Sequence, residues 1–181
     1  GSRSIRFSVV RYGNVMGSRG SVIPFFHGRR ASGVLPITHP EMTRFNISLQ
    51  EGVEMVLWSI ENALGGEILV PKIPSYRVVD VATAVGPECR QEIVGVRPGE
   101  KLHEEMITSS DSPNTVDVGA YYAILPSGPG YDIDQYCERY GAKRVPSGFS
   151  YNSGANDDFL SVEQLRALIA DHAQSAGGAD A

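Results

Sequence analysis

The feature that most constrains the fold is an apolar segment followed at once by a loop of small residues. The segment Ile5–Tyr12 reads IRFSVVRY, and its β-branched and aromatic side chains predict a buried strand of a parallel sheet. The Gly-rich run GNVMGSRGSVIP follows, which predicts a loop at the carboxyl end of that strand. Such a loop normally comes late in a nucleotide-binding domain, yet here it stands near the first residue. We therefore expect the chain to be the back part of an enzyme.

Helices and short strands alternate after this loop, which is typical of an α/β fold. The clearest helix spans Leu49–Leu64: Ser48 and Glu51 form a capping box, apolar residues recur at steps of three and four, and Gly65-Gly66 ends it. Further helices are predicted at Val22–Ser32, Val78–Val85 and Ser161–Ala170, and further strands at Leu35–Thr38, Met42–Ile47, Glu67–Pro71, Gln91–Val96 and Tyr121–Leu125.

The remaining stretches are expected to be less regular. Lys101–Met106 is predicted to form one or two helical turns, and Thr108–Gly119 an exposed connection. Residues 126–157 are rich in Gly, Pro, Ser, Asn and Tyr and predict an ordered but irregular arm. Gly1-Ser2 resembles a remnant of an expression tag, and Gln174–Ala181 is expected to be a disordered tail.

Composition narrows the class of protein. Hydrophobic content of 41% and a formal net charge of −5 are those of an ordinary globular chain, and the scattered basic residues argue against a nucleic-acid binder. Cys89 and Cys137 lack C-x-x-C spacing and are expected to be reduced, structural thiols. No apolar run approaches the ~20 residues of a membrane span, so we expect no membrane segment here and a cytoplasmic location.

The glycines of the loop are compatible with three interpretations. Gly13, Gly17 and Gly20 have G-x3-G-x2-G spacing, but a true dinucleotide fingerprint requires the first βαβ unit and an acidic residue about 20 positions on. We favour a late, ligand-facing loop over that fingerprint and over a merely structural turn. Within it, Asn14 can bind a ligand or make a turn, and Arg19 can pair with phosphate or be solvated.

A second group of charged residues follows a predicted strand end. The run Arg97-Pro98-Gly99-Glu100-Lys101 stands where ligands of open α/β sheets bind. Arg97 there can clamp a diphosphate, and Glu100 can accept hydrogen bonds from the two ribose hydroxyls. The alternative is a surface Arg–Glu pair of little energetic value. Arg44 offers another cation for a phosphate, with the same alternative.

No set of residues in the chain forms an evident acid, base or nucleophile arrangement. The four histidines lack metal-ligand spacing, H-E-x-x-H and G-x-S-x-G are absent, and Tyr140 and Lys143 are one residue too close for Tyr-x-x-x-Lys. The residues singled out can bind ligands, and neither a catalytic residue nor a metal site is predicted.

At this point the chain resembles a known family. The successive segments VVRYGNVMGSRGSVIPFF, LPITHPEMTRF, GGEILVPKIPS, GVRPGEKLHEEMI and YNSGANDDFLSVEQLR are similar to the C-terminal half of the inverting UDP-N-acetylglucosamine 4,6-dehydratases, in the extended short-chain dehydrogenase/reductase superfamily. The resemblance runs from about Ile5 to Ile169. It implies an α/β fold made of the last strands and helix of an incomplete, doubly wound Rossmann sheet, plus the small substrate-binding lobe. Residues 5–22 and 48–71 would belong to the Rossmann layer, and residues 23–47 and 72–173 to the lobe.

The resemblance also implies roles for individual residues. The positions that match contacts to a UDP-sugar are Asn14, Val22, Thr38, Arg97 and Glu100. The stretch that matches the part lying along NADP, or NAD, is Val15, Met16, Gly17, Ser18 and Arg19. UDP-N-acetylglucosamine or a related UDP-sugar is the implied substrate, in the synthesis of bacterial surface or flagellar glycans.

The family's first glycine fingerprint and its catalytic residues belong to the N-terminal half, which this sequence lacks. We therefore expect the chain alone to be inactive, not to retain the cofactor, and to expose apolar surface that favours homo-oligomers. A 4- or 5-epimerase of the same superfamily, or a non-catalytic nucleotide-sugar-binding module, are the alternative functions.

Overall fold

The computed structural model describes residues 5–18, 20–128 and 131–177. The chain divides into two compact units, each assembled from separate stretches of sequence. The first unit comprises Gly1–Tyr12, Gln50–Lys72 and Glu105–Asn152, and the second comprises Gly13–Leu49, Ile73–Glu104 and Ser153–Ala181. The prediction had assigned all of 72–173 to one lobe, whereas contacts group residues 105–152 with the first unit.

A mixed five-stranded sheet forms the centre of the first unit. Its strand order is β1 (Val9–Val10), β5 (Ile68–Pro71), β10 (Tyr121–Ile124), β9 (Thr115–Asp117) and β11 (Lys143–Arg144). β1 runs parallel to β5, and the other pairs are antiparallel. Because β5 has a neighbour on either side, its Leu69 and Val70 are fully buried, as its uninterrupted apolar sequence requires.

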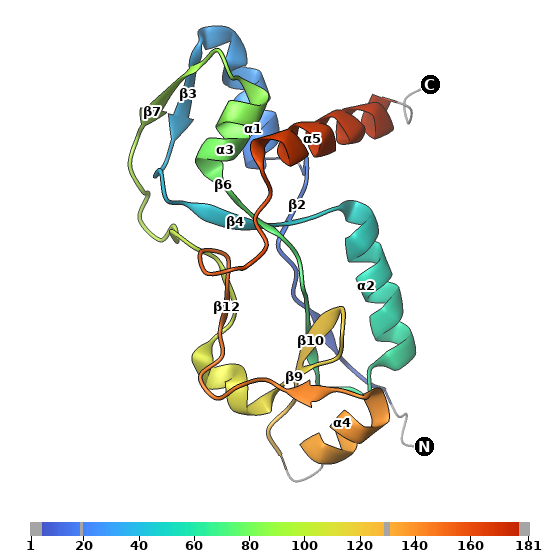
Figure 1. Cartoon of the computed structure of the whole chain (residues 1–181). Helices are drawn as coiled ribbons and strands as arrows, with labels where there is room; N and C mark the ends of the chain where they lie inside the picture. The colour runs from blue at the N-terminus through green and yellow to red at the C-terminus, as the bar shows by residue number, and fades with distance from the viewer. Residues whose placement is uncertain (1–4, 19, 129–130, 178–181) are drawn as a thin grey trace. The chain divides into compact units, whose positions relative to one another are not determined.

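Two helices of the first unit pack on this sheet (Figure 1). They are α2 (Leu49–Asn62) and α4 (Ile133–Tyr140), and Met55 and Tyr136 carry their buried faces into one apolar cluster with β5, β9 and β10. The 3-10 helix η2 (Ser109–Asn114) precedes β9, and β8 (Glu105–Ile107) pairs antiparallel with β12 (Tyr151–Asn152).

Three helices and two small sheets form the second unit. β2 (Asn14–Val15), β4 (Thr43–Ile47) and β6 (Ser75–Arg77) make one sheet, and β3 (Val34–Ile37) pairs in parallel with β7 (Arg90–Ile93). α3 (Val78–Val85) packs against α1 (Val22–Arg29) and α5 (Val162–Gly177), and η1 (Arg30–Ser32) extends α1 (Figure 1). Their apolar faces share one core with β3, which includes Phe26, Leu35, Val81 and Leu165.

Most of the predicted helices are confirmed. α1 with η1, α2 and α3 lie where their patterns indicated, although α2 ends at Asn62, two residues before the predicted end, and Gly65-Gly66 follow in the turn with positive φ angles of 109° and 95°. The Ser161–Gln164 capping box of α5 is present in both directions. However, α5 continues to Gly177, so the predicted disorder is wrong for residues 174–177, and 178–181 lie outside the described residues.

Four expectations about irregular or strand regions are wrong. Glu105–Ile107 is a strand, not part of a helical turn. The predicted exposed connection contains η2 and β9, whose Val116 is fully buried. The predicted irregular arm contains α4, which Asp132 caps through two backbone N–H groups. Ile5–Tyr12 is not a buried strand: only Val9–Val10 pair, because β5 covers one edge of β1 and no strand of the described residues covers the other.

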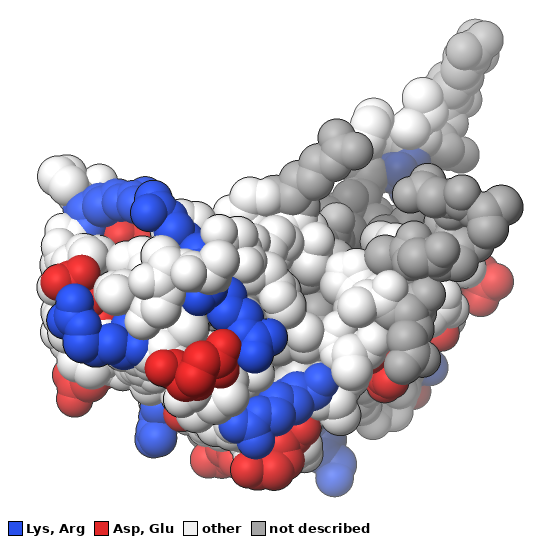
Figure 2. All heavy atoms as spheres, turned by 90° about the horizontal axis from the view of Figure 1, so that it is seen from above, with Lys and Arg blue, Asp and Glu red and all other residues white. Residues whose placement is uncertain are grey.

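Charges of both signs are mixed on the face of the molecule seen from above (Figure 2). In Figure 2 the Lys and Arg side chains on the visible face are interspersed with Asp and Glu. Within the described part of the chain, no helix is both long and apolar enough to cross a membrane.

Candidate functional site

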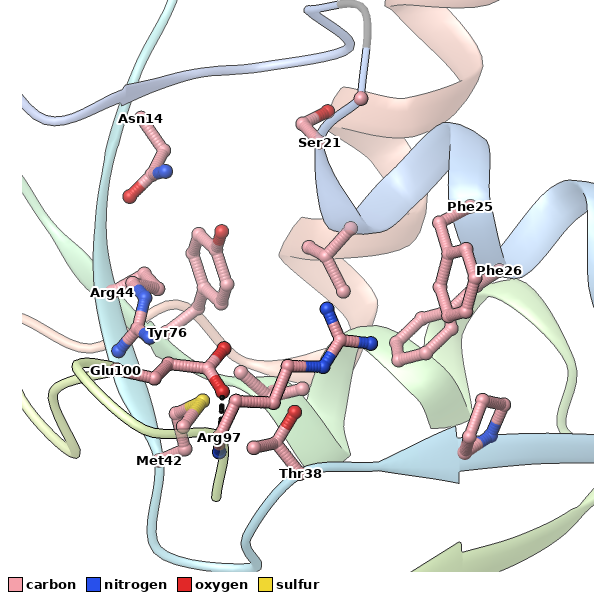
Figure 3. Close-up of a pocket in the computed structure, with 14 residues that line it drawn as sticks. Asn14, Ser21, Phe25, Phe26, Thr38, Met42, Arg44, Tyr76, Arg97 and Glu100 are labelled. Carbon is pink, nitrogen blue, oxygen red and sulfur yellow. Dashed lines mark hydrogen bonds between the residues drawn. The ribbon is translucent and has the colours of Figure 1, made fainter. Parts of the chain in front are cut away.

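The second unit contains a pocket of about 320 Å³ (Figure 3). Its walls come from β2, the start of α1, the β3–β4 region, β6 and the turn after β7. Apolar side chains line part of it, with Phe25 and Phe26 together on one side and Met42 on the other, and polar or charged side chains reach in from several elements. This mixture of apolar side chains with a few convergent polar groups is typical of a small-molecule site.

The pocket gathers residues that are far apart in sequence. Asn14, Val22, Thr38, Arg97 and Glu100, which the resemblance links to a UDP-sugar, all line it. Figure 3 shows Asn14 directed toward the same space that Arg97 and Glu100 enter from the opposite side. The structure therefore brings the five residues together in one pocket, and the contacts to a UDP-sugar stay predictions.

The turn that carries Arg97 and Glu100 is closed by reciprocal hydrogen bonds. The Arg97 N–H donates to the Glu100 carboxylate at 3.2 Å, and the Glu100 N–H donates to the Arg97 carbonyl at 3.0 Å. Gly99 between them has a φ of 82°, which glycine adopts without strain. Among the described residues the Arg97 guanidinium has neither an acceptor nor a carboxylate partner, so its five N–H groups are available to an anionic ligand.

Arg44 also lines the pocket, but part of its guanidinium is engaged within the protein. Its Nη1 donates to the carbonyls of Thr43 at 2.7 Å and Leu102 at 3.2 Å, and its Nε lies 3.5 Å from the Glu104 carboxylate. The side chain is only 12% exposed. Arg44 therefore stabilises the pocket wall and adds positive charge to it, whereas the guanidinium of Arg97 has no partner among the described residues.

The two ends of the Gly-rich loop line the pocket, and the described residues of its middle part do not. β2 pairs in parallel with β4, and the Met16 N–H donates to the Ile47 carbonyl at 2.9 Å. Of the positions assigned to a cofactor, Val15, Met16, Gly17 and Ser18 do not line this pocket. Arg19 lies outside the described residues.

Two further polar residues line the pocket that were not predicted from the sequence, Ser21 and Tyr76. Tyr76 comes from β6, a strand that was not predicted, and stands opposite Arg44 in the β4–β6 pairing. It is 3% exposed, and burial raises the pKa of its hydroxyl to about 12, although Arg44 opposes this shift. The only local signal for this strand was the aromatic Tyr76 in the segment Ser-Tyr-Arg after Pro74, and three residues are too few to predict a strand.

The side chains of the pocket can bind a ligand but include no evident group for acid–base catalysis. Its titratable side chains are Arg44, Tyr76, Arg97 and Glu100, and the neutral Tyr76 phenol cannot act as a base near pH 7. Among the described residues, no group of three His, Cys, Asp or Glu side chains can hold a metal ion.

Comparisons relate the chain to known proteins. It is 46% identical over 177 residues to the UDP-N-acetylglucosamine 4,6-dehydratase (inverting) of Campylobacter jejuni subsp. jejuni serotype O:23/36 (strain 81-176), a match covering 93% of this chain and 52% of the relative. It is 37% identical over 166 residues to the UDP-glucose 4-epimerase of Rickettsia akari (strain Hartford), covering 89% of this chain and 48% of that protein. The chain thus spans about half the length of the curated relatives it matches.

The fold also has a solved counterpart. The X-ray structure of Pen from Bacillus thuringiensis superimposes with a TM-score of 0.76 at 31% identity, covering 92% of this chain and 50% of that chain. The α/β fold class and the resemblance to the dehydratases are confirmed. Residues 1–126, more than half of the sequence, match the family described as "Polysaccharide biosynthesis protein". The chain belongs to this polysaccharide biosynthesis protein family.

Proposed function

We propose that this chain is the UDP-sugar-binding part of a C5-inverting UDP-N-acetylglucosamine 4,6-dehydratase. The observation that carries the proposal is the convergence of Asn14, Arg97 and Glu100 on one pocket. A diphosphate, a ribose and a sugar require a free guanidinium, a carboxylate and neutral polar groups, and the pocket provides all three. The name of the Campylobacter jejuni relative supports this choice of substrate.

In this proposal each polar side chain has a distinct role. The guanidinium of Arg97 clamps the diphosphate through its planar fork of donors. Glu100 uses one carboxylate oxygen to hold the Arg97 backbone, and its other oxygen can accept from the ribose hydroxyls. Asn14 contacts the sugar, while Val22 and Thr38 bound the ligand and Arg44 contributes charge at longer range.

The Gly-rich loop is the proposed contact for a nicotinamide cofactor, NADP or NAD. Residues 13–24 contain no carboxylate that would repel a pyrophosphate. Gly20 has a φ of 79° and no atom within 4 Å of the position of a Cβ, so the backbone there is open to a close ligand. The cofactor, when bound, would supply hydride transfer. This chain would supply binding along Val15–Arg19 and no proton-transfer group.

Exposed apolar side chains support the proposal that a further part of the protein completes this one. In β1 and its approach, Ile5 is 64% exposed and Phe7 77% exposed. α2 also exposes Leu57 and Ile60, although its opposite face is buried. Such a surface beside an open strand edge is expected to be covered in a larger protein or to drive self-association. We propose that the isolated chain is inactive and homo-oligomeric.

A fusion enzyme tests the proposed function. The part of the Campylobacter jejuni relative that lies outside the match is joined to this chain, and UDP-N-acetylglucosamine is supplied with NADP. The expected product is a 4-keto-6-deoxy sugar nucleotide, detected by its absorbance after alkali treatment. The same fusion with Arg97→Met should fold but produce far less. A folded, cofactor-loaded fusion that yields neither keto product nor epimer would contradict the proposal.

A second candidate function is a 4-epimerase, favoured by the 37% identity to the Rickettsia akari protein. The same assay separates the two reactions. An epimerase converts UDP-N-acetylglucosamine to its C4 epimer without releasing water and without accumulating a keto product.

A further inference from the structure

We propose that the hydroxyl groups of Tyr76 and Ser21 bind the hexose ring of the nucleotide sugar through hydrogen bonds. This inference rests on the proposed function and extends it to two residues that were not among the predicted contacts. It follows from two hydroxyl groups at the pocket, one buried without a partner and one that the fold turns toward the pocket from an otherwise buried ring.

Tyr76 provides the first observation. Its ring is 3% exposed and belongs to the apolar core of the second unit, whereas its hydroxyl faces the pocket (Figure 3). Among the described residues this hydroxyl forms no hydrogen bond. The apolar surroundings of the ring leave the pocket as the side from which a partner can reach the hydroxyl, and tyrosines that bury their ring usually pair their hydroxyl. A ligand in the pocket can supply the missing partner.

Ser21 provides the second, independent observation. It occupies the N-cap position of α1, yet its side chain makes no capping hydrogen bond. An N-cap serine normally accepts from the second or third residue of the helix, and here the third is Pro24, which has no N–H. The Ser21 Oγ is buried and has no partner in the described structure. It lines the pocket as Tyr76 does.

The charge distribution in the pocket indicates which part of the ligand these groups meet. In Figure 3, Asn14, Ser21 and the Tyr76 hydroxyl lie on one side of the pocket, and Glu100, Thr38 and the Arg97 backbone on the other. Among the described residues two cations line the pocket: the Nη1 of Arg44 is engaged by backbone carbonyls, and the guanidinium of Arg97 reaches from the second side into the middle of the pocket. Neutral hydroxyl and amide groups that both donate and accept match the hydroxyl and acetamido groups of a hexose, whereas a diphosphate requires the free guanidinium of Arg97.

Ligand-observed NMR titrations of this chain with two probes, UDP-N-acetylglucosamine and UDP, test the inference. Tyr76→Phe should weaken binding of UDP-N-acetylglucosamine about tenfold, the effect of losing one buried hydrogen bond, and leave UDP binding unchanged. Ser21→Ala should act in the same direction by about fivefold. Arg97→Met should weaken both probes. Tyr136→Phe, which alters a buried tyrosine of the first unit that does not line this pocket, should change neither.

The possible outcomes separate the two proposals. If wild-type protein binds both probes and Tyr76→Phe and Ser21→Ala bind like wild type, the inference is overturned and the proposed function stands. If the variants lose affinity for UDP as strongly as for the sugar nucleotide, the hexose assignment is overturned. If the folded wild-type chain binds neither probe, the proposed function and the inference both fail. Should Tyr76→Phe not fold, Ser21→Ala alone decides, since the Ser21 side chain makes no hydrogen bond that the fold would lose.

Discussion

A Cβ atom on Gly17 would lie 1.5 Å from Nε2 of His172. The imidazole of α5 thus occupies the space that any side chain at position 17 would need. The φ of Gly17, 68°, falls in the left-handed region as well, so another residue at this position would adopt a strained backbone and would also have to displace the His172 ring. Through this contact α5 supports the loop that we propose to hold the cofactor.

Replacing Gly17 should therefore destabilise the protein more than replacing Gly20. Gly20→Ala introduces only backbone strain, about 1 kcal/mol, because nothing lies within 4 Å of the new Cβ. Gly17→Ala adds a steric clash and should cost about 2–4 kcal/mol, a fall in Tm of several degrees by calorimetry. The double variant Gly17→Ala/His172→Ala should recover part of the loss. Equal melting temperatures for the two glycine variants would show that the His172 contact is absent.

Arg97 and Arg44 should separate binding from stability. Arg97→Met removes a guanidinium without a protein partner, so UDP affinity should fall by about ten- to a hundredfold while Tm stays unchanged. Arg44→Met leaves the Thr43 and Leu102 carbonyls without their donor and should cost about 1–3 kcal/mol of stability. Calorimetric titration with UDP and thermal unfolding of both variants measure the difference. A large loss of stability in Arg97→Met would contradict the free guanidinium.

Local signals in the sequence were sufficient for several elements and insufficient for others. α2 and α3 were predicted because their apolar periodicity and end residues agree. α4 was missed because residues 126–157 have the composition of a loop, although Asp132 and Gly141, with its φ of 60°, mark its two ends. β8 and β12 were missed because each is short and depends on the other, about 45 residues away, for its hydrogen bonds.

The site shows a similar division. Asn14, Arg97 and Glu100 were identified through short segments typical of a family, and each stands after a strand or strand-like segment. Tyr76 could not be identified in this way, since only the tertiary fold shows that its ring is buried while the residue lines the pocket. The Ile5–Tyr12 strand illustrates the opposite error: an apolar sequence predicts burial only if a neighbour covers it.

Asp117 should contribute to stability in a pH-dependent way. Burial alone would raise the pKa of this carboxyl, but hydrogen bonds from Lys72, at 2.6 Å, and from the Gly119 N–H hold it below its ordinary value of 3.8. Because the folded pKa is depressed, the stabilisation is present above about pH 4 and is lost as the pH falls through the folded pKa.

Urea denaturation of wild type and Asp117→Asn at pH 7 and pH 3 checks this. The wild type should be more stable at pH 7 by less than about 1 kcal/mol, since the pair is partly exposed, and the gap should narrow at pH 3. In a Lys72→Met background, Asp117→Asn should cost less stability at pH 7 than it does in the wild type. A gap that is constant with pH would exclude a depressed carboxyl pKa.

The two faces of α2 should respond differently to substitution. Leu57 and Ile60 are 55% and 74% exposed, so Leu57→Gln/Ile60→Glu should leave Tm nearly unchanged and reduce self-association of the chain. Met55 on the same helix is fully buried, and Met55→Ala should cost about 2–5 kcal/mol without reducing self-association of the folded fraction. Sedimentation velocity over a range of concentrations, with thermal unfolding, measures both effects. The proposal states that this exposed apolar face drives self-association of the isolated chain. A wild-type chain that remains monomeric at every concentration would therefore contradict it.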